Sequence, residues 1–284
     1  MNIKKITIET DEGIYTGSLS FTPTLPPPPP ILPKWVLLNV INWAVFSDAD
    51  FNDISEATYF VLPVSKEGNL LGTSDATEKT FVNLVHSKGK KVTFSVAGGS
   101  QNIPDITTAV TINSLRFIQQ ITTHIKQYNY DGVTLDIENT NITSNAMVDF
   151  VRFLRIAMDN IKPGLIIGIY TQPFQLNNVW SRIGEVAKDF NWLSPMMYDR
   201  GPYNKEQWTA DTNAWLPRVG GDKSKLLYGL SPNYGAAGTL NELQYADALD
   251  TVNKEGWGGV GIWEHSKYRQ SFRDVQRAKF PHIS

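Results

Sequence analysis

Short apolar segments recur eight times between residues 34 and 284, and most of them are followed by a helical pattern. In one such pattern Leu115, Ile118 and Ile121 lie on a single stripe of a helix. Strands that alternate with helices form parallel sheets, and eight units in about 250 residues favour a closed (β/α)8 TIM barrel over an open doubly wound sheet. The predicted strands are Trp35–Trp43, Ala57–Val64, Lys91–Ala97, Tyr130–Glu138, Leu165–Thr171, Trp192–Tyr198, Leu226–Ser231 and Gly259–Trp263.

The chain is predicted to have one catalytic domain, residues 34–284, preceded by a short arm. The connection between the last two predicted strands has room for one helix, so no large insertion domain is expected. Residues 1–24 predict an N-terminal arm that contains a β-hairpin, which is too small to be stable alone. The proline-rich residues 25–33 predict a stiff polyproline II linker.

Two interpretations of this arm stay open. In the first, residues 1–33 dock the protein on a larger protein particle, of a phage-like or injection type. In the second, they form a strand pair that packs on the bottom of the barrel. The N-terminus turns polar before the apolar core of a signal peptide develops. We therefore expect a protein made in the cytoplasm, which would act outside the cell after lysis or on such a particle.

Composition excludes several other functions. Lysine and arginine number 26 against 28 acidic residues, so neither nucleic acid nor an anionic membrane is an expected partner. Without cysteine there is no thiol nucleophile and no zinc–cysteine site. The four histidines show no ligand spacing. No metal and no cofactor are therefore expected.

Polar residues alternate with apolar ones in the predicted strand Tyr130–Glu138. Thr134, Asp136 and Glu138 share one face of this strand, because side chains two apart point the same way. A buried carboxylate without partners costs several kcal/mol, and reactive groups in TIM barrels lie at the carboxyl ends of the strands. The two carboxylates therefore indicate catalysis. The alternative is an ion-pair network with lysine or arginine at the mouth of the barrel.

Other predicted strand ends add aromatic and polar groups. Aromatic rings stack on sugar faces, and carboxyl groups act on glycosidic oxygens, so this combination suits a carbohydrate substrate. Four further aromatic residues either line outer sugar sites or pack beneath helices: Trp180, Trp208, Trp215 and Tyr203. The residues at the strand ends are Ser95, Gly98, Met196, Tyr198, Asp199, Tyr234 and Trp263.

From Trp35 to its end the chain resembles glycoside hydrolase family 18, the chitinases and their relatives. The family pattern Asp-x-x-Asp-x-Asp-x-Glu is met by Asp131, Asp136 and Glu138, with Thr134 in the place of its second aspartate. Three further family motifs occur in the same order along the chain. They are met by Ser95 to Gly98 imperfectly, by Met196, Tyr198 and Asp199, and by Trp263.

The resemblance implies retaining, substrate-assisted hydrolysis of β-1,4-linked N-acetylglucosamine polymers, in which the 2-acetamido oxygen of the sugar attacks the anomeric carbon. It implies that Glu138 is the general acid and base, that Asp136 orients the acetamido group, and that Tyr198 binds its oxygen. Threonine cannot carry the charge of the missing aspartate, so Asp136 is expected to stay ionised. The implied substrate-binding residues are Asp199, Met196, Trp263 and Tyr234, and the implied supporting residues are Asp131, Thr134, Ser95 and Gly98.

Two other functions stay open beside chitin hydrolysis. One is an N-acetylglucosaminidase that acts on peptidoglycan or N-glycans, since both contain an acetamido sugar. The other is a catalytically weak, lectin-like component that binds chitin on a larger particle. Retention of Glu138 argues against the lectin, whereas Thr134 argues weakly for it.

Overall fold

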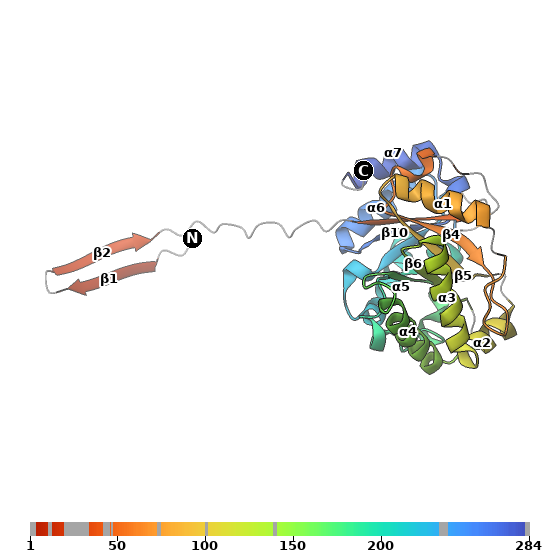
Figure 1. Ribbon diagram of the computed structural model, residues 1–284. Coiled ribbons are helices and arrows are strands. Elements are labelled where there is room, and N and C mark those ends of the chain that lie inside the picture. Colours follow the sequence, from red (N-terminus) through yellow and green to blue (C-terminus); the bar gives the residue numbers. More distant parts are fainter. Residues whose placement is uncertain are drawn as a thin grey trace. The chain divides into compact units, whose positions relative to one another are not determined.

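The computed structural model describes residues 4–10, 13–19, 34–41, 46, 48–72, 75–99, 102–138, 141–232 and 238–281. Its contacts divide the chain into two compact units, Met1–Leu32 and Pro33–Ser284. In the first unit β1 (Lys4–Thr10) pairs antiparallel with β2 (Gly13–Leu19) (Figure 1). The predicted linker, residues 25–33, lies outside the described residues.

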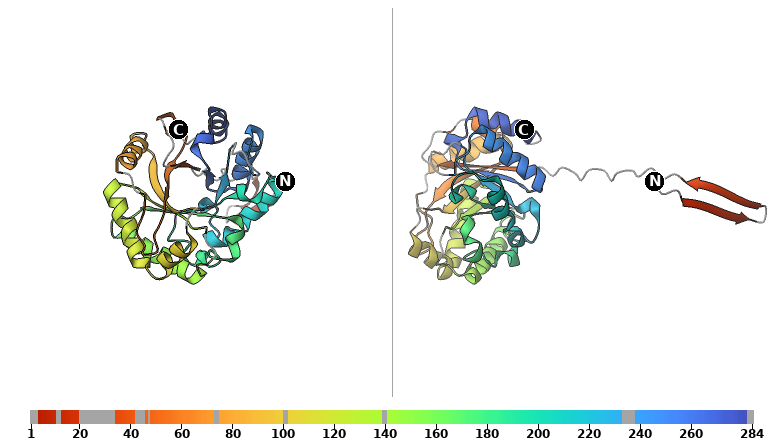
Figure 2. Two further views of the ribbon diagram at one scale, coloured as in Figure 1. Left: turned by 90° about the vertical axis from the view of Figure 1, so that its right-hand side faces the viewer. Right: turned by 180° about the vertical axis from the view of Figure 1, so that it is seen from behind.

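The second unit is the predicted (β/α)8 TIM barrel, with helices arranged around eight parallel strands (Figure 2). The order around the barrel is β8-β7-β6-β5-β4-β3-β10-β9. Parallel bridges Leu193↔Leu226 and Met196↔Gly229 join β8 to β9 and close the ring. The strands are β3 (Trp35–Ile41), β4 (Glu56–Leu62), β5 (Lys91–Ala97), β6 (Gly132–Asp136), β7 (Ile166–Thr171), β8 (Trp192–Pro195), β9 (Leu227–Leu230) and β10 (Gly259–Ile262).

Helices cover the outside of the barrel, and one apolar stripe on each longer helix faces the strands. Between β9 and β10 the described chain contains α6 and no insertion domain, as predicted. The α-helices are α1 (Asp75–Ser87), α2 (Ile103–Thr111), α3 (Ser114–Tyr128), α4 (Ser144–Asp159), α5 (Lys205–Asn213), α6 (Glu242–Glu255) and α7 (Gln270–Lys279). The 3-10 helices are η1 (Asp48–Phe51), η2 (Pro173–Asn177), η3 (Ile183–Val186), η4 (Met197–Arg200), η5 (Leu216–Val219), η6 (Lys223–Lys225) and η7 (His265–Lys267).

Two separate apolar clusters follow from the alternation of side chains along each strand. The larger cluster fills the layer between strands and helices, and it contains Trp180, Trp208 and Trp215, all buried. These three tryptophans therefore pack beneath helices and do not form outer sugar sites. The smaller cluster fills the inside of the barrel, and consists of Leu37, Ile166, Tyr170, Trp192, Met196 and Leu227.

One glycine makes room for the largest side chain inside the barrel. A Cβ atom on Gly168 would lie 2.1 Å from the Trp192 ring. With glycine there, the indole crosses the interior and its Nε1 donates to Glu56 Oε2 at 3.3 Å. The interior below the carboxyl ends of the strands is therefore filled and is not a channel.

Candidate active site

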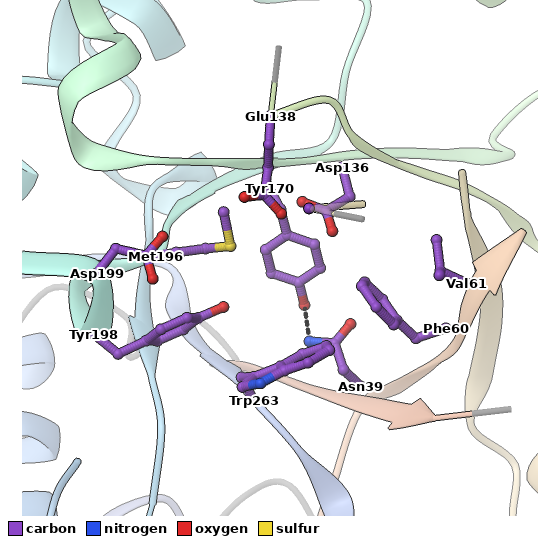
Figure 3. Close-up of a pocket in the computed structure, with 11 residues that line it drawn as sticks. Asn39, Phe60, Val61, Asp136, Glu138, Tyr170, Met196, Tyr198, Asp199 and Trp263 are labelled. Carbon is purple, nitrogen blue, oxygen red and sulfur yellow. Dashed lines mark hydrogen bonds between the residues drawn. The ribbon is translucent and has the colours of Figure 1, made fainter. Parts of the chain in front are cut away.

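A pocket of about 370 Å³ opens at the carboxyl ends of the strands and contains most of the predicted site (Figure 3). Its residues come from seven of the eight strands or the segments that follow them, so the closed barrel is what brings them together. It is lined by Asn39, Phe60, Val61, Gly99, Asp136, Glu138, Tyr170, Met196, Tyr198, Asp199 and Trp263.

Asp136 is the last residue of β6, and its side chain is buried. Its carbonyl oxygen accepts from Gly98 N at 2.7 Å, whereas its Oδ1 has no hydrogen-bond partner among the described residues. Burial raises the pKa of Asp136 well above its ordinary value, and the nearby charges of Glu138 and Asp199 raise it further. The expectation that Asp136 stays ionised is therefore not supported, since three carboxyl groups share this site.

Glu138 lies two residues beyond the end of β6 and is half-buried. Its Oε2 accepts a hydrogen bond from Gln172 Nε2 at 2.7 Å. Burial raises the pKa of Glu138 to about 7, the charge of Asp199 contributes, and a hydrogen bond from the Gly99 backbone opposes the rise. A carboxyl group with a pKa of about 7 can both donate and accept a proton near neutral pH, as a general acid and base must.

Tyr198 and Asp199 lie on η4, although the sequence predicted a strand that continues to Tyr198. The strand β8 ends at Pro195, and Asp199 N bonds back to Met196 O at 3.1 Å to form the turn. This turn points the Tyr198 hydroxyl into the pocket (Figure 3). Burial and the nearby Asp136 and Asp199 raise the pKa of Tyr198 well above its ordinary value. The phenol thus stays protonated and can donate a hydrogen bond.

Asp199 and Met196 complete this side of the pocket. Burial raises the pKa of Asp199 to about 6. The Met196 side chain belongs to the cluster inside the barrel, whereas that of Met197 packs in the outer layer.

Trp263 follows β10 and lies across the pocket from Glu138 (Figure 3). Its ring meets Phe60 edge-on, with centroids 4.5 Å apart and an angle of 73° between the rings. Cis peptide bonds join Phe60 to Val61 and Trp263 to Glu264. The two rings form an apolar wall opposite the carboxylates.

Sequence reasoning missed several pocket residues. Tyr170 OH accepts from Asn39 Nδ2 at 2.9 Å, and the same Nδ2 is 3.1 Å from Ile262 O. Asn39, Phe60 and Tyr170 sit inside apolar strands, where their polarity or size alone gives no signal. Their inward parity was a usable signal, because each lies near the end of a strand. Gln172 directly follows β7 and was also missed.

The predicted supporting residues lie in different places. Thr134 is buried, and its Oγ1 lies 3.2 Å from that of Thr93. Ser95 pairs with Thr134 in the sheet, and its hydroxyl has no partner among the described residues. Gly98 has φ 93°, and a Cβ atom there would lie 3.3 Å from Val61. Tyr234 lies outside the described residues.

Asp131 lies at the opposite end of β6 from the pocket, about five residues or 16 Å away from Asp136 along the strand. There it accepts from His86 Nε2 at 2.9 Å, Lys91 Nζ at 3.0 Å and Val92 N at 3.0 Å. These contacts fix the start of the strand. The position of Asp131 therefore gives no support to its predicted place beside the site.

The alternative of an ion-pair network is not supported. In the described part of the chain neither Asp136 nor Glu138 forms an ion pair with lysine or arginine, and no cluster of side chains suited to a metal ion is found there. Among the same residues no helix has the length and apolar character needed to cross a bilayer.

Carboxyl groups with raised pKa values and an aromatic wall share one pocket at the carboxyl ends of a TIM barrel, an arrangement typical of glycosidases. The chain belongs to glycosyl hydrolases family 18, whose family model matches residues 42–247. The probable chitinase 10 of Drosophila melanogaster is 26% identical over 229 residues, which cover 69% of this chain. This chain spans 10% of the length of that relative.

Solved structures share the barrel. A family 18 chitinase from Pseudoalteromonas aurantia has a TM-score of 0.76 at 16% identity, and covers 86% of this chain and 99% of its own. A chitinase from Bacteroides thetaiotaomicron has a TM-score of 0.74 at 16% identity, and covers 87% of this chain and 96% of its own. The spore cortex-lytic enzyme SleL of Bacillus megaterium has a TM-score of 0.72 at 10% identity, and covers 90% of this chain and 76% of its own. At these identities the likeness is one of fold.

Proposed function

We propose that this chain hydrolyses β-1,4-linked N-acetylglucosamine polymers such as chitin, with retention of configuration. The observation that carries the proposal is the pair formed by Glu138 and Asp136. Glu138 has a pKa of about 7, and Asp136 lies deeper in the pocket with a free, buried oxygen. The relation to a probable chitinase supports chitin as the substrate class.

In this mechanism the substrate supplies the nucleophile, so the protein needs one acid and a means of holding the amide. Glu138 protonates the glycosidic oxygen while the acetamido oxygen attacks the anomeric carbon and the leaving sugar departs. Glu138 then takes a proton from the water that opens the cyclic intermediate, and so returns to its acid form.

The other side chains hold the acetamido group during this step. The free Oδ1 of Asp136 accepts from the acetamido N–H, and the Tyr198 hydroxyl donates to the acetamido oxygen. Trp263 provides the apolar surface on which the sugar ring stacks, and Asp199 binds its polar edge. The positive charge that develops on the intermediate favours the ionised form of Asp136, which stabilises that charge in turn.

Mass spectrometry of products from three substrates tests the proposal: chitin oligomers, peptidoglycan and a chitobiose-core glycan. We expect cleavage of the chitin oligomers by the wild type and none by Glu138→Gln. Cleavage of peptidoglycan or of the glycan alone would point to the alternative N-acetylglucosaminidases. Binding without cleavage of any substrate would point to the lectin-like function.

We also propose that residues 1–33 attach the enzyme to a protein particle, of a phage-like or injection type. Support comes from the described arm, whose two strands pair with each other from Lys4↔Leu19 to Thr10↔Gly13. A two-stranded sheet of this size is marginally stable alone and gains stability by adding to a larger sheet. Release on such a particle or by lysis would bring the enzyme to an extracellular polymer.

A further inference from the structure

The side chain of Gln172 makes a direct contact with the general acid. Its Nε2 lies 2.7 Å from Glu138 Oε2. Gln172 comes just after β7, which is the neighbour of β6 in the barrel, so the contact joins the ends of two adjacent strands. No lysine or arginine pairs with Glu138 in the described part of the chain, and the amide is thus a neutral donor to this carboxyl group.

The backbone around Gln172 is held independently of that contact. Gln172 N donates to Gln175 Oε1 at 3.0 Å, and Gln175 N bonds back to Gln172 O at 3.0 Å. Gln175 is buried, accepts from Thr171 Oγ1 at 3.1 Å and places its Nε2 at 3.4 Å from Ile137 O. The start of η2 therefore contacts both the Glu138 carboxyl group and the residue before it. Such support fixes the direction from which the amide reaches Glu138.

The chemistry of this contact favours one protonation state. The side-chain nitrogen of glutamine can only donate, and the ionised carboxylate is the better acceptor. The other side chains that face Glu138 do not stabilise its ionised form. Asp136 on β6 and Asp199 on η4 are acidic, and the phenols of Tyr198 and Tyr170 carry no positive charge. Among the described residues, the amide of Gln172 and the Gly99 backbone are hydrogen-bond donors that stabilise the anion.

We propose that Gln172 is a positioning residue, which holds the Glu138 side chain against the end of β7 and stabilises its ionised form between the acid and base steps. This inference rests on the proposed role of Glu138 as the general acid and base. Without the amide, Glu138 would hold its proton to higher pH. It would then be a weaker acid, slower to protonate the glycosidic oxygen and so to reach the basic form that activates water.

The test is a titration of the Glu138 carboxyl carbon by NMR in the full-length, glutamate-labelled protein, with Glu138→Gln to assign the signal. We expect Gln172→Leu to raise the midpoint by about one pH unit, because the loss of one hydrogen bond to an ionised carboxylate raises its pKa by about that amount. The matched control is Gln270→Leu. That glutamine also donates to a carboxylate, Asp274, at 2.9 Å, but on the exposed surface of α7. Its loss should leave the Glu138 midpoint unchanged.

A second variant, Gln172→Glu, keeps the shape and adds a like charge, so it should raise the midpoint at least as far. It serves where the leucine variant does not fold. In kinetics on a fluorogenic chitin oligomer, we expect the alkaline limb of kcat/KM to move upward with the midpoint, and kcat to fall about tenfold with a smaller change in KM.

An unchanged midpoint in folded Gln172→Leu or Gln172→Glu would overturn the inference, whatever the substrate. A wild type that cleaves no acetamido sugar would instead overturn the proposed function. The NMR titration would still report whether Gln172 stabilises the Glu138 anion, so the two failures are distinguishable.

Discussion

Glu138 carries the clearest prediction at the scale of the residue. Glutamine has nearly the same shape but cannot donate the proton, so Glu138→Gln should lower kcat by about 10²–10⁴-fold or more. The fold and the binding of chitin oligomers should persist. Turnover and binding can be measured on the same purified protein. Wild-type turnover in this variant would rule out Glu138 as the acid.

Thr134 occupies the position of the second aspartate in the family pattern. The contacts of its hydroxyl group show what this position does here. Thr134 Oγ1 lies 3.2 Å from Thr93 Oγ1, and Thr93 in turn donates to Glu56 Oε1 at 2.8 Å. One buried carboxyl group inside the barrel, that of Glu56, therefore lies on β4. Thr134 belongs to a hydroxyl chain that leads to it.

Thr134→Asp should add a buried carboxyl group next to Asp136 along β6 and change the pH–rate profile. Like charges raise each other's pKa, so both limbs of the profile should move upward. Thr134→Val is the matched control, since it removes the hydroxyl and adds no charge, and its profile should match the wild type. An identical profile in a folded Thr134→Asp variant would show that this position is not coupled to Asp136.

Glu56 makes a prediction for stability. Burial raises the pKa of Glu56 to about 7 from an ordinary value of 4.5. Its contribution to the free energy of unfolding is thus fully present below pH 4.5 and is lost as the pH rises through about 7. Glu56→Gln mimics the protonated form, because an amide can donate to Thr93 while Trp192 still donates to its oxygen.

Urea denaturation of wild type and Glu56→Gln at pH 4.5 and pH 8 measures this effect. We expect nearly equal stability at the lower pH. At pH 8 the variant should be more stable by on the order of 3 kcal/mol, since the pKa of Glu56 is about 7 in the folded protein against an ordinary value of 4.5. A variant less stable than the wild type at pH 8 would contradict the raised pKa of the buried Glu56 carboxyl group.

At the scale of the element, strand ends decide what the sequence reveals. All eight barrel strands were predicted, because each is an apolar run followed by a turn or a helix. The β8 segment was predicted three residues too long, since Met196 and Tyr198 continue its apolar pattern. The turn of η4 depends on a contact between Met196 N and Thr171 O at 2.8 Å, which no local pattern shows.

The same reasoning explains the gaps in the predicted site. Asp136 and Glu138 stood out because carboxylates are costly inside a strand. Gln172 follows a strand, as many polar residues do, and its contact with Glu138 depends on the pairing of β6 with β7. Asn39 contributes from the far side of the ring. The inward parity of Asn39 on its strand was a signal, but its place in this pocket becomes visible only once the order of strands is known.

Gly168 in β7 offers a test of the packing inside the barrel. A Cβ atom there would lie 2.1 Å from the Trp192 ring, so Gly168→Ala should displace the indole and lower the free energy of unfolding by about 1–3 kcal/mol or more. Gly164→Ala is the control. Gly164 has φ +86° but nothing within 4 Å, so its cost of about 1 kcal/mol is one of backbone strain alone. Equal losses in urea denaturation would mean that Trp192 does not occupy this space.

At the scale of the whole molecule, composition and periodicity favoured a closed barrel but could not establish that the barrel closes. Eight units favour a barrel, but an open sheet can hold the same number. The choice depends on the contacts between β8 and β9, which link residues 30 or more apart. Those contacts also bring Met196 and Tyr198 opposite Phe60 and Trp263, so the fold and the pocket depend on the same closure.

The arm makes the last prediction, at the same scale. Contacts of the chain fall into Met1–Leu32 and Pro33–Ser284, so deletion of residues 1–33 should leave the melting temperature and the turnover of short chitin oligomers unchanged. Deletion should abolish co-sedimentation with the particle that carries the full-length protein, because β1 and β2 would be lost. Ile8→Pro is a matched variant with the full length retained: it removes one backbone donor from β1 and should weaken attachment while sparing catalysis. A large loss of thermal stability or activity in the truncated protein would show that the arm belongs to the barrel, and the attachment proposal would then be wrong.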